Sequence, residues 1–178
     1  MGASIDHTSQ TMYVNSNNIP WNAKLIQKEN KKYSYNSSFS RLVDQNGFPG
    51  SKPPWGTISS MNLNTGKINW TIPFGYYLEL KKKNIGTENF GGVTATKGNL
   101  IFATGTLDSN IYAYDTFTGE QLWEKKLPYI GSSPPSIYKA NREQYVIVQS
   151  TGSASLKKGY PDLVTFGDAI VAFKLNNK

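Results

Sequence analysis

The sequence has no cysteine and only one histidine among its 178 residues. Without cysteine the chain can form neither a disulfide nor a Cys-ligated zinc site, and it has no thiolate nucleophile. With one histidine, a multi-histidine metal site is excluded, as is a Ser-His-Asp triad built on any other histidine. That histidine, His7, lies in the polar segment Asp-His-Thr-Ser, so we interpret it as part of a surface turn rather than as a catalytic residue.

Long apolar runs and long helical patterns are also missing. No stretch of about 18 apolar residues is present, so no membrane-spanning helix is expected, and no apolar segment behind a basic start indicates a secretory signal. The abundant residues are aromatic, with 11 Tyr, 8 Phe and 4 Trp, and 16 Gly and 9 Pro are spread along the chain. This mixture is typical of many short strands joined by turns and argues against a helical bundle.

The net charge is +7 and the pI is about 9.4. The lysines gather in three segments that are interpreted as loops, so they are either solvated loop tips or a patch for an anionic partner such as nucleic acid or acidic lipid. Because no nucleic-acid-binding motif accompanies them, solvated loops are the preferred interpretation and no nucleic-acid partner is expected. The three clusters are Lys28, Lys31 and Lys32; Lys81, Lys82 and Lys83; and Lys157 and Lys158.

A repeated motif organises the chain. Residues 60–70 and 113–123 share a small or apolar residue, an Asn or Asp two positions on, a Thr-Gly pair, and a Trp four positions after the Gly. The alternation before the Asn or Asp predicts a strand, and the Thr-Gly pair predicts a hairpin turn, because Gly tolerates positive φ. A Trp at the end of the second strand can pack between neighbouring sheets. Such repeats indicate stacked supersecondary units.

A second hairpin pattern accompanies each copy of the first, at residues 2–15, 91–105 and 135–150, and a last copy of the first pattern begins at residue 167. We therefore predict one all-β domain over residues 1–178, made of three four-stranded antiparallel β-propeller blades at about 2–72, 88–128 and 130–176. The last copy stops before a Thr-Gly turn and a Trp. A polar insertion, about residues 20–54, interrupts the first blade, and a loop of this length is usually functional or mobile.

Several motifs together resemble the C-terminal part of pyrroloquinoline-quinone (PQQ) dehydrogenases of the membrane glucose dehydrogenase type. They are Pro-Pro-Trp-Gly-Thr at 53–57, Gly-Thr-Glu-Asn-Phe-Gly-Gly at 86–92, the two Trp repeats, Leu-Pro at 127–128 and residues 167–173. The resemblance covers nearly the whole chain in the family's order. It implies a sector of an eight-bladed propeller in a periplasmic enzyme that oxidises alcohols or sugars. PQQ, with a calcium or magnesium ion, would accept hydride in the central channel and pass electrons to a quinone or cytochrome.

The same resemblance implies site residues. Asn89, Phe90 and Gly91 would approach PQQ, Asp108 would lie near the substrate entrance, and Trp55 would face the pocket. Each has a structural alternative. Gly91 and its neighbour would permit tight packing of inner strands, Asp108 would be an ordinary turn residue, and Trp55 would pack in the interior.

The chain also departs from the family. Where the family often has Gly-Gly-His-Gly, residues 151–154 read Thr-Gly-Ser-Ala, which puts sugar specificity in doubt. Nothing matches the family's catalytic aspartate, its companion Lys or Arg, most metal ligands or the Trp that stacks on PQQ, so no catalytic and no metal-binding residue is predicted in this chain.

Three blades are fewer than a closed propeller needs, and two apolar faces would be left in water. We expect a fragment that is inactive alone, a homo-oligomer, or a chain completed by the blades of a partner. Two functions are considered: a segment that supplies part of the quinone pocket wall of an alcohol or sugar dehydrogenase, or a non-enzymatic propeller scaffold for protein–protein interaction.

Overall fold

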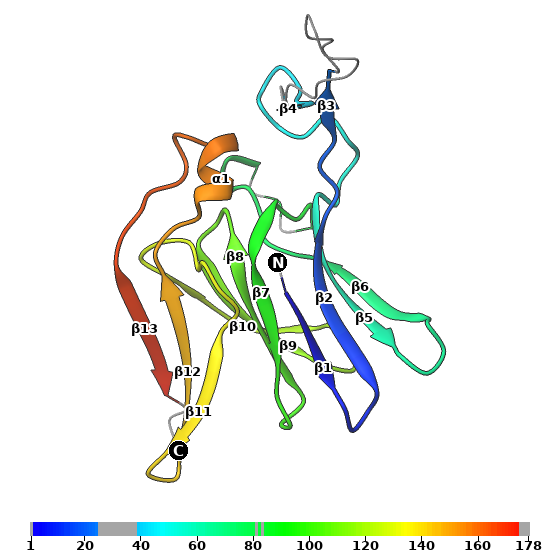
Figure 1. Cartoon of the computed structure of the whole chain (residues 1–178), viewed down its shortest axis with the longest axis vertical. Helices are drawn as coiled ribbons and strands as arrows, with labels where there is room; N and C mark the ends of the chain where they lie inside the picture. The colour runs from blue at the N-terminus through cyan, green and yellow to red at the C-terminus, as the bar shows by residue number, and fades with distance from the viewer. Residues whose placement is uncertain (1, 25–38, 81, 83, 175–178) are drawn as a thin grey trace, which may run out of the picture.

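The computed structural model describes residues 2–24, 39–80, 82 and 84–174, and these residues form three antiparallel sheets that fan out side by side (Figure 1). The first sheet has the order β1-β2-β5-β6 and the second has the order β10-β9-β8-β7, while the third, β11-β12-β13, has three strands among the described residues. The chain is therefore all-β and propeller-like, as predicted. Within the described part, the fourth strand expected in the third sheet is not present, in keeping with the missing Thr-Gly and Trp of the last repeat.

The strand bounds follow the predicted hairpins. In the first sheet they are β1 (Ala3–Asp6), β2 (Thr11–Asn17), β5 (Gly56–Asn62) and β6 (Ile68–Pro73). In the second sheet they are β7 (Asn89–Ala95), β8 (Leu100–Thr106), β9 (Asn110–Asp115) and β10 (Gln121–Lys126). In the third sheet they are β11 (Ser136–Ala140), β12 (Glu143–Ser150) and β13 (Ala169–Lys174).

Short elements lie at the upper ends of the sheets, where the longer loops are. The insertion of the first sheet contributes a two-stranded ribbon of β3 (Trp21–Ala23) and β4 (Phe39–Arg41), which stands above the sheets in Figure 1. The 3-10 helix η1 (Leu78–Leu80) lies between the first and second sheets in the chain, and the six-residue helix α1 (Ala154–Gly159) lies between β12 and β13. No helix in the described ranges is long and apolar enough to cross a membrane.

The middle sheet is apolar on both faces because its strands alternate between two cores. Tyr112 and Tyr114 of β9 belong to the cluster shared with the first sheet, whereas Ile111 belongs to the cluster shared with the third. Neighbouring residues of a strand point to opposite faces, which explains this division. The predicted alternation of β9 is thereby confirmed, and the second sheet is packed between the other two.

The Asx-Thr-Gly turns close the outer hairpins as the sequence indicated. Asp115 accepts hydrogen bonds at Oδ1 from the backbone N–H groups of Phe117 and Thr118, both at 2.8 Å. Asn62 makes the same contacts in the first repeat. Gly66 and Gly119 have φ of +68° and +74°, a conformation that other residues rarely adopt. The two turns are built alike because each is determined by local residues.

Trp70 joins the first sheet to the second. Its Nε1–H donates to the backbone oxygen of Thr116 at 3.1 Å, and its ring lies 6.1 Å from that of Tyr13. A Cβ at Gly119 would come within 3.0 Å of the indole, so this Gly also makes room for the ring. Trp70 thus docks on the Thr-Gly turn of the next repeat.

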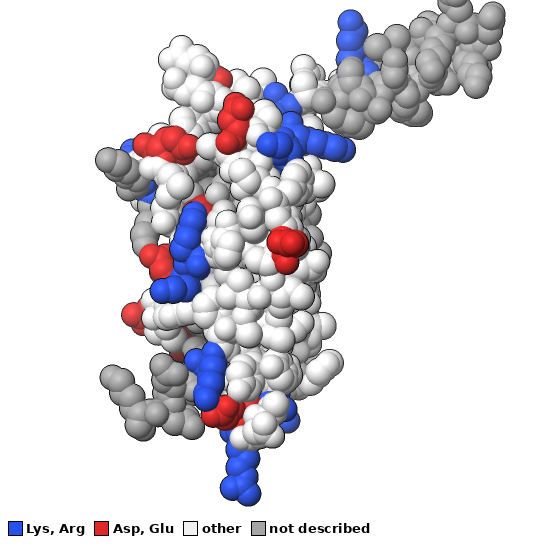
Figure 2. All heavy atoms as spheres, turned by 90° about the vertical axis from the view of Figure 1, so that its left-hand side faces the viewer, with Lys and Arg blue, Asp and Glu red and all other residues white. Residues whose placement is uncertain are grey.

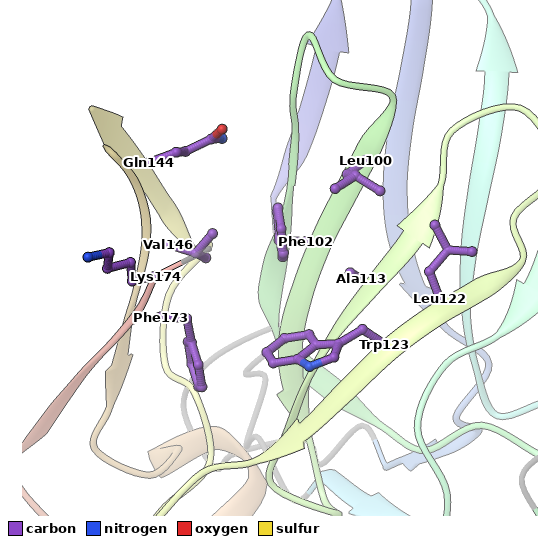
Figure 3. A pocket seen from close by; sticks show the side chains of 9 residues that line it. All are labelled: Leu100, Phe102, Ala113, Leu122, Trp123, Gln144, Val146, Phe173 and Lys174. Atoms are coloured by element: carbon purple, nitrogen blue, oxygen red, sulfur yellow. The ribbon is translucent and has the colours of Figure 1, made fainter. Parts of the chain in front are cut away.

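Trp123 occupies the equivalent place between the second and third sheets, but it is more open. Its ring meets Phe173 edge to face, with centroids 5.2 Å apart. The indole is 37% exposed and lines an apolar groove of about 460 Å³ whose other wall includes Val146 and Phe173 (Figure 3). Both repeat tryptophans therefore lie between sheets, which the propeller interpretation required.

Because Trp70 and Trp123 are packed to different extents, we expect their replacement by alanine to lower the free energy of unfolding by different amounts. We expect Trp70→Ala to lower the free energy of unfolding by about 3 kcal/mol, because it removes a packed ring. Trp123→Ala should cost only about half as much, because its indole already borders an open groove. Chemical denaturation of both variants measures the difference. A loss for Trp123→Ala equal to that for Trp70→Ala would contradict the proposed inequality.

Candidate functional site

The upper ends of the inner strands form the part of the molecule where the predicted site residues come together. β1 and β7 are neighbours there, and Pro134, in the loop before β11, contacts both: ideal Cβ atoms at Gly2 and Gly92 would lie 3.5 and 2.5 Å from its Cγ. The loop after β2, the loop before β7 and the loop after β12 reach the same end. This end is the candidate functional site.

Asn89, predicted to approach PQQ, lies at the start of β7 and is fully buried. Its side-chain amide donates to Oδ1 of Asn17 at 2.8 Å, and its Oδ1 accepts a hydrogen bond from Nδ2 of Asn15. Asn17 in turn donates from its own amide to the backbone oxygen of Asn89 at 2.9 Å. We call Asn15, Asn17 and Asn89 the amide cluster. It fastens β2 of the first sheet to β7 of the second.

Gly91 is placed against the backbone of β8. A Cβ on it would lie 2.0 Å from the backbone oxygen of Thr104, and β7 shifts its register to β8 between Asn89 and Gly92. Gly105 faces Gly91 in the same bulge and has φ of +104°. The close approach of the two backbones is sufficient to explain a glycine here. The prediction that Gly91 approaches a cofactor remains a prediction.

Trp55 and Phe90 belong to an apolar cluster below the upper loops. The Trp55 ring stacks on Phe48 at 6.0 Å and meets Tyr77 edge to face at 5.4 Å. Its Nε1–H donates to the backbone oxygen of Ser51 at 2.7 Å. Trp55 is buried, and Phe90 packs against the same cluster as a partly buried side chain. The indole N–H of Trp55 is therefore bonded within the insertion, and its ring acts in packing.

Asp108, predicted near the substrate entrance, is buried in the turn between β8 and β9 and is 1% exposed. Oδ1 accepts from the hydroxyl of Thr106 at 2.7 Å and from the backbone N–H of Asn110 at 2.9 Å. Oδ2 accepts from the Tyr112 hydroxyl and the Tyr76 backbone N–H, both at 2.8 Å. Burial raises the pKa of the carboxyl, and these hydrogen bonds oppose that shift. The side chain ties the loop before β7 to the second sheet.

A cavity of about 480 Å³ lies beside the amide cluster. Asn15 and Asn17 line it on one side and Gly2 on the other, next to the upper end of β1. Asn15 is 2% exposed, and its Oδ1 has no hydrogen-bond donor among the described residues. A cavity of this size with amide groups in its wall suits part of a flat, polar ligand. This opening beside β1 and β2 is therefore a candidate binding surface.

Sequence analysis missed Asn15 and Asn17. They lie in Val-Asn-Ser-Asn, at alternate positions of β2, and only the packing of this strand against β7 of the next sheet brings them to Asn89. The one available signal was two amides spaced by two residues in a strand that otherwise buries Tyr13 and Thr11. Polar residues on the buried face of a strand must find partners.

The other sequence predictions are placed as follows. His7 lies in the exposed turn between β1 and β2. Lys157, interpreted as a solvated residue, donates from Nζ to the backbone oxygens of Pro161 and Val164. Lys28, Lys31, Lys32, Lys81 and Lys83 lie outside the described residues, as does much of the insertion. In the described ranges no group of three His, Cys, Asp or Glu side chains could hold a metal ion.

The family model and the curated relatives that match this chain all belong to the same group of quinone-dependent dehydrogenases. Residues 1–146 match the model of the PQQ glucose/ethanol/alcohol dehydrogenase β-propeller domain. The quinoprotein glucose dehydrogenase of Escherichia coli (strain K12) is 31% identical over 150 residues, covering 79% of this chain and 18% of that protein. A probable quinate dehydrogenase (quinone) of Xanthomonas campestris pv. juglandis is 32% identical over 147 residues, covering 76% of the chain and 18% of that protein.

Among solved structures, a europium-containing methanol dehydrogenase superposes with a TM-score of 0.73 at 20% sequence identity. The match covers 98% of this chain and 32% of that one, and it supports the fold alone. The chain thus spans about a fifth of the length of the curated relatives it matches, with 18% of each covered in the two cases above.

The amide cluster makes a prediction about stability. Asn89→Ala removes the hydrogen-bond partner of the buried Asn15 amide and one partner of the half-buried Asn17 amide, so we expect a loss of about 2–4 kcal/mol in the free energy of unfolding. Asn64→Ala, in an exposed turn, is the matched control and should change it by less than about 0.5 kcal/mol. Urea denaturation measures both. Equal effects of the two substitutions would show that the cluster does not hold the sheets together.

Proposed function

Because the chain belongs to the PQQ glucose/ethanol/alcohol dehydrogenase β-propeller family, we propose that it supplies one sector of the quinone pocket wall of an alcohol or sugar dehydrogenase. The observation that carries this proposal is the cavity beside the amide cluster, at the upper ends of the inner strands. The whole enzyme would act in the periplasm, and this segment alone would be inactive. When bound, PQQ with its calcium or magnesium ion supplies the acceptor for the two electrons of the substrate.

In this proposal, the residues of this chain help to bind the quinone and to orient it. Asn15 and Asn17 line the cavity, and the partly exposed amide of Asn17 is the group that can bond a ligand there. Asn89 acts through them, because its amide is held by Asn15 and Asn17 rather than directed at the cavity. Trp55 and Phe90 contribute by packing in an apolar cluster with Tyr77 rather than by lining the cavity. Asp108 holds the loop at the substrate side in place.

A titration with PQQ tests this proposal. We expect the purified chain to bind PQQ with a change in the quinone absorbance, in a titration run both with and without calcium. Asn17→Ala should weaken binding by about tenfold, since it removes an amide of the wall. Asn64→Ala, at the opposite end of the first sheet, should leave binding unchanged. Circular dichroism of each variant verifies that it is folded.

No binding at several hundred micromolar PQQ would contradict a pocket wall in the isolated chain. The second candidate function, a non-enzymatic scaffold for protein–protein interaction, would then remain. One observation favours it: the polar atoms of Trp55, Asn89 and Asp108 all have hydrogen-bond partners inside the protein. Residues committed to packing serve a scaffold as well as they serve an enzyme.

We also propose that the outer faces of the first and third sheets are contact surfaces, either for a second copy or for the missing blades of a partner. Ile5 and Ile68 on the first sheet are 46% and 58% exposed, and Ile170 on the third is 74% exposed. Tyr138 stacks on Tyr145 beside it, with ring centroids 5.1 Å apart. Figure 2 shows the side of the third sheet, where charged side chains of both signs border a broad uncharged area. Such apolar faces favour association.

Sedimentation velocity tests this association. We expect the chain to be oligomeric at micromolar concentration, and we expect Ile170→Lys to shift it toward the monomer, because it places a charge on a face that association would dehydrate. Leu63→Lys, at a 40% exposed position in a hairpin turn, is the control and should leave the distribution unchanged. A stable monomer of the unmodified chain in this range would contradict the proposal.

A further inference from the structure

Most contacts between sheets in this molecule join a sheet to the one next to it: the first to the second, and the second to the third. The first and second sheets share one apolar cluster, and the second and third share another. A further apolar cluster, which includes Trp55, Tyr77 and Leu156, joins the loops at the upper ends. Such an arrangement lets an end unit open while the rest stays packed, because each unit contacts only the next one. A contact from the first sheet to the third would change that behaviour. Arg41, at the end of β4 in the insertion, makes one.

Arg41 lies in the loop insertion of the first sheet, and its side chain contacts loops of both the second and the third sheet. Its Nη2 lies 2.5 Å from Oε2 of Glu88, in the loop that enters β7 of the second sheet. Its guanidinium lies over the ring of Tyr160, in the loop of the third sheet, at 4.5 Å from the centroid. The ring of Trp21 from β3 also lies near the guanidinium, with its centroid 5.3 Å from Cζ. The charged group is therefore held by an ion pair and two aromatic rings.

The site is shaped for this side chain. Arg41 and Glu88 are 9% and 2% exposed at their side chains, whereas residues 42–47, which follow Arg41, are all exposed. A Cβ on Gly159 would lie 1.3 Å from Nη1 of Arg41, so only a glycine leaves room for the guanidinium. Tyr160 is fixed in turn, because its hydroxyl lies 2.7 Å from the hydroxyl of Tyr77. The contact is thus a buried ion pair rather than a surface one, in which Nε and Nη1 of Arg41 have no hydrogen-bond partner among the described residues.

The chemistry of the pair explains why Arg is used. Burial is the largest influence on the carboxyl of Glu88 and raises its pKa, and the charge of Arg41 opposes that rise. A planar guanidinium can pair with a carboxylate at its edge while aromatic rings cover its faces, which the ammonium of a lysine cannot do. Removing one partner of a buried pair leaves the other charge uncompensated.

We propose that Arg41 is a clamp that couples the insertion of the first sheet to the loop of the third, so that residues 39–50 and residues 154–166 open together. Without it, only the apolar cluster that includes Phe48, Tyr77 and Tyr160 would connect the two segments, so their opening would be less strongly coupled. The coupling is reciprocal: loosening either end of the clamp loosens the other. This inference concerns the chain alone and is independent of whether it binds a quinone.

Hydrogen exchange of the full chain, followed by mass spectrometry of peptides, tests the clamp. Arg41→Met should speed exchange by on the order of 100-fold in both 39–50 and 154–166, the scale of breaking a buried ion pair. Peptides from β8 and β9 should be unchanged. Val43→Ala, an exposed neighbour in the same loop, is the control and should alter neither segment. Faster exchange in 39–50 alone would overturn the proposal.

Three further variants keep the test decisive if Arg41→Met does not fold. The double variant Arg41→Met with Glu88→Gln leaves no uncompensated charge, yet it still lacks the clamp, so both segments should exchange faster. Tyr160→Leu removes the ring on the third sheet, and it should speed exchange in 39–50 on the opposite side. Tyr160→Phe keeps the ring and should speed it far less. Unchanged exchange of 39–50 in Tyr160→Leu would refute the coupling.

Discussion

The burial of both faces of the middle sheet is the constraint on which the rest of this structure depends. A sheet with apolar side chains on alternate sides needs a neighbour on each side, because each buried aromatic or branched side chain contributes about 1.5–3 kcal/mol by leaving water. β9 is the plainest case, since Tyr112 faces one core and Ile111 the other. The first and third sheets satisfy this need for the second. Their own outer faces remain exposed, with Ile170 at 74%.

The part of the fold that depends on local residues could be predicted from the sequence. An Asn or Asp that accepts from the two following N–H groups, and a Gly with positive φ, build the same turn wherever they occur. Asn62 and Asp115 do so in their own hairpins. The repeat then predicted where Trp70 and Trp123 would lie, between successive sheets. The repeat also led us to expect four strands in every sheet, whereas the third sheet has three among the described residues.

The polar contacts between sheets could not be predicted, because the residues that make them do not recur at a fixed spacing in the sequence. Asn89 bonds to Asn17, which precedes it by 72 residues, and Glu88 pairs with Arg41 from an insertion that has no counterpart in the repeat. A polar residue near the axis has the same sequence signature whether it faces a ligand or a neighbouring strand. This ambiguity explains why Asn89 and Asp108 were predicted to face a cofactor or substrate, while the structure shows their polar atoms bonded to protein groups. Their role toward a ligand remains a prediction.

Apolar contacts hold the sheets of this molecule together, whereas hydrogen bonds between the sheets fix their relative orientation. Apolar contact is nearly non-directional, so two sheets that share only a core can rotate or slide with little loss of buried area. A hydrogen bond weakens steeply when its geometry changes, so the amide cluster fixes how β2 lies against β7. The amides that line the cavity are therefore the same groups that set the angle between the first two sheets. It follows that the shape of the cavity and the packing of the sheets cannot vary independently: a substitution that reshapes the wall through Asn17 also releases β7, and a change in how the sheets pack alters the wall.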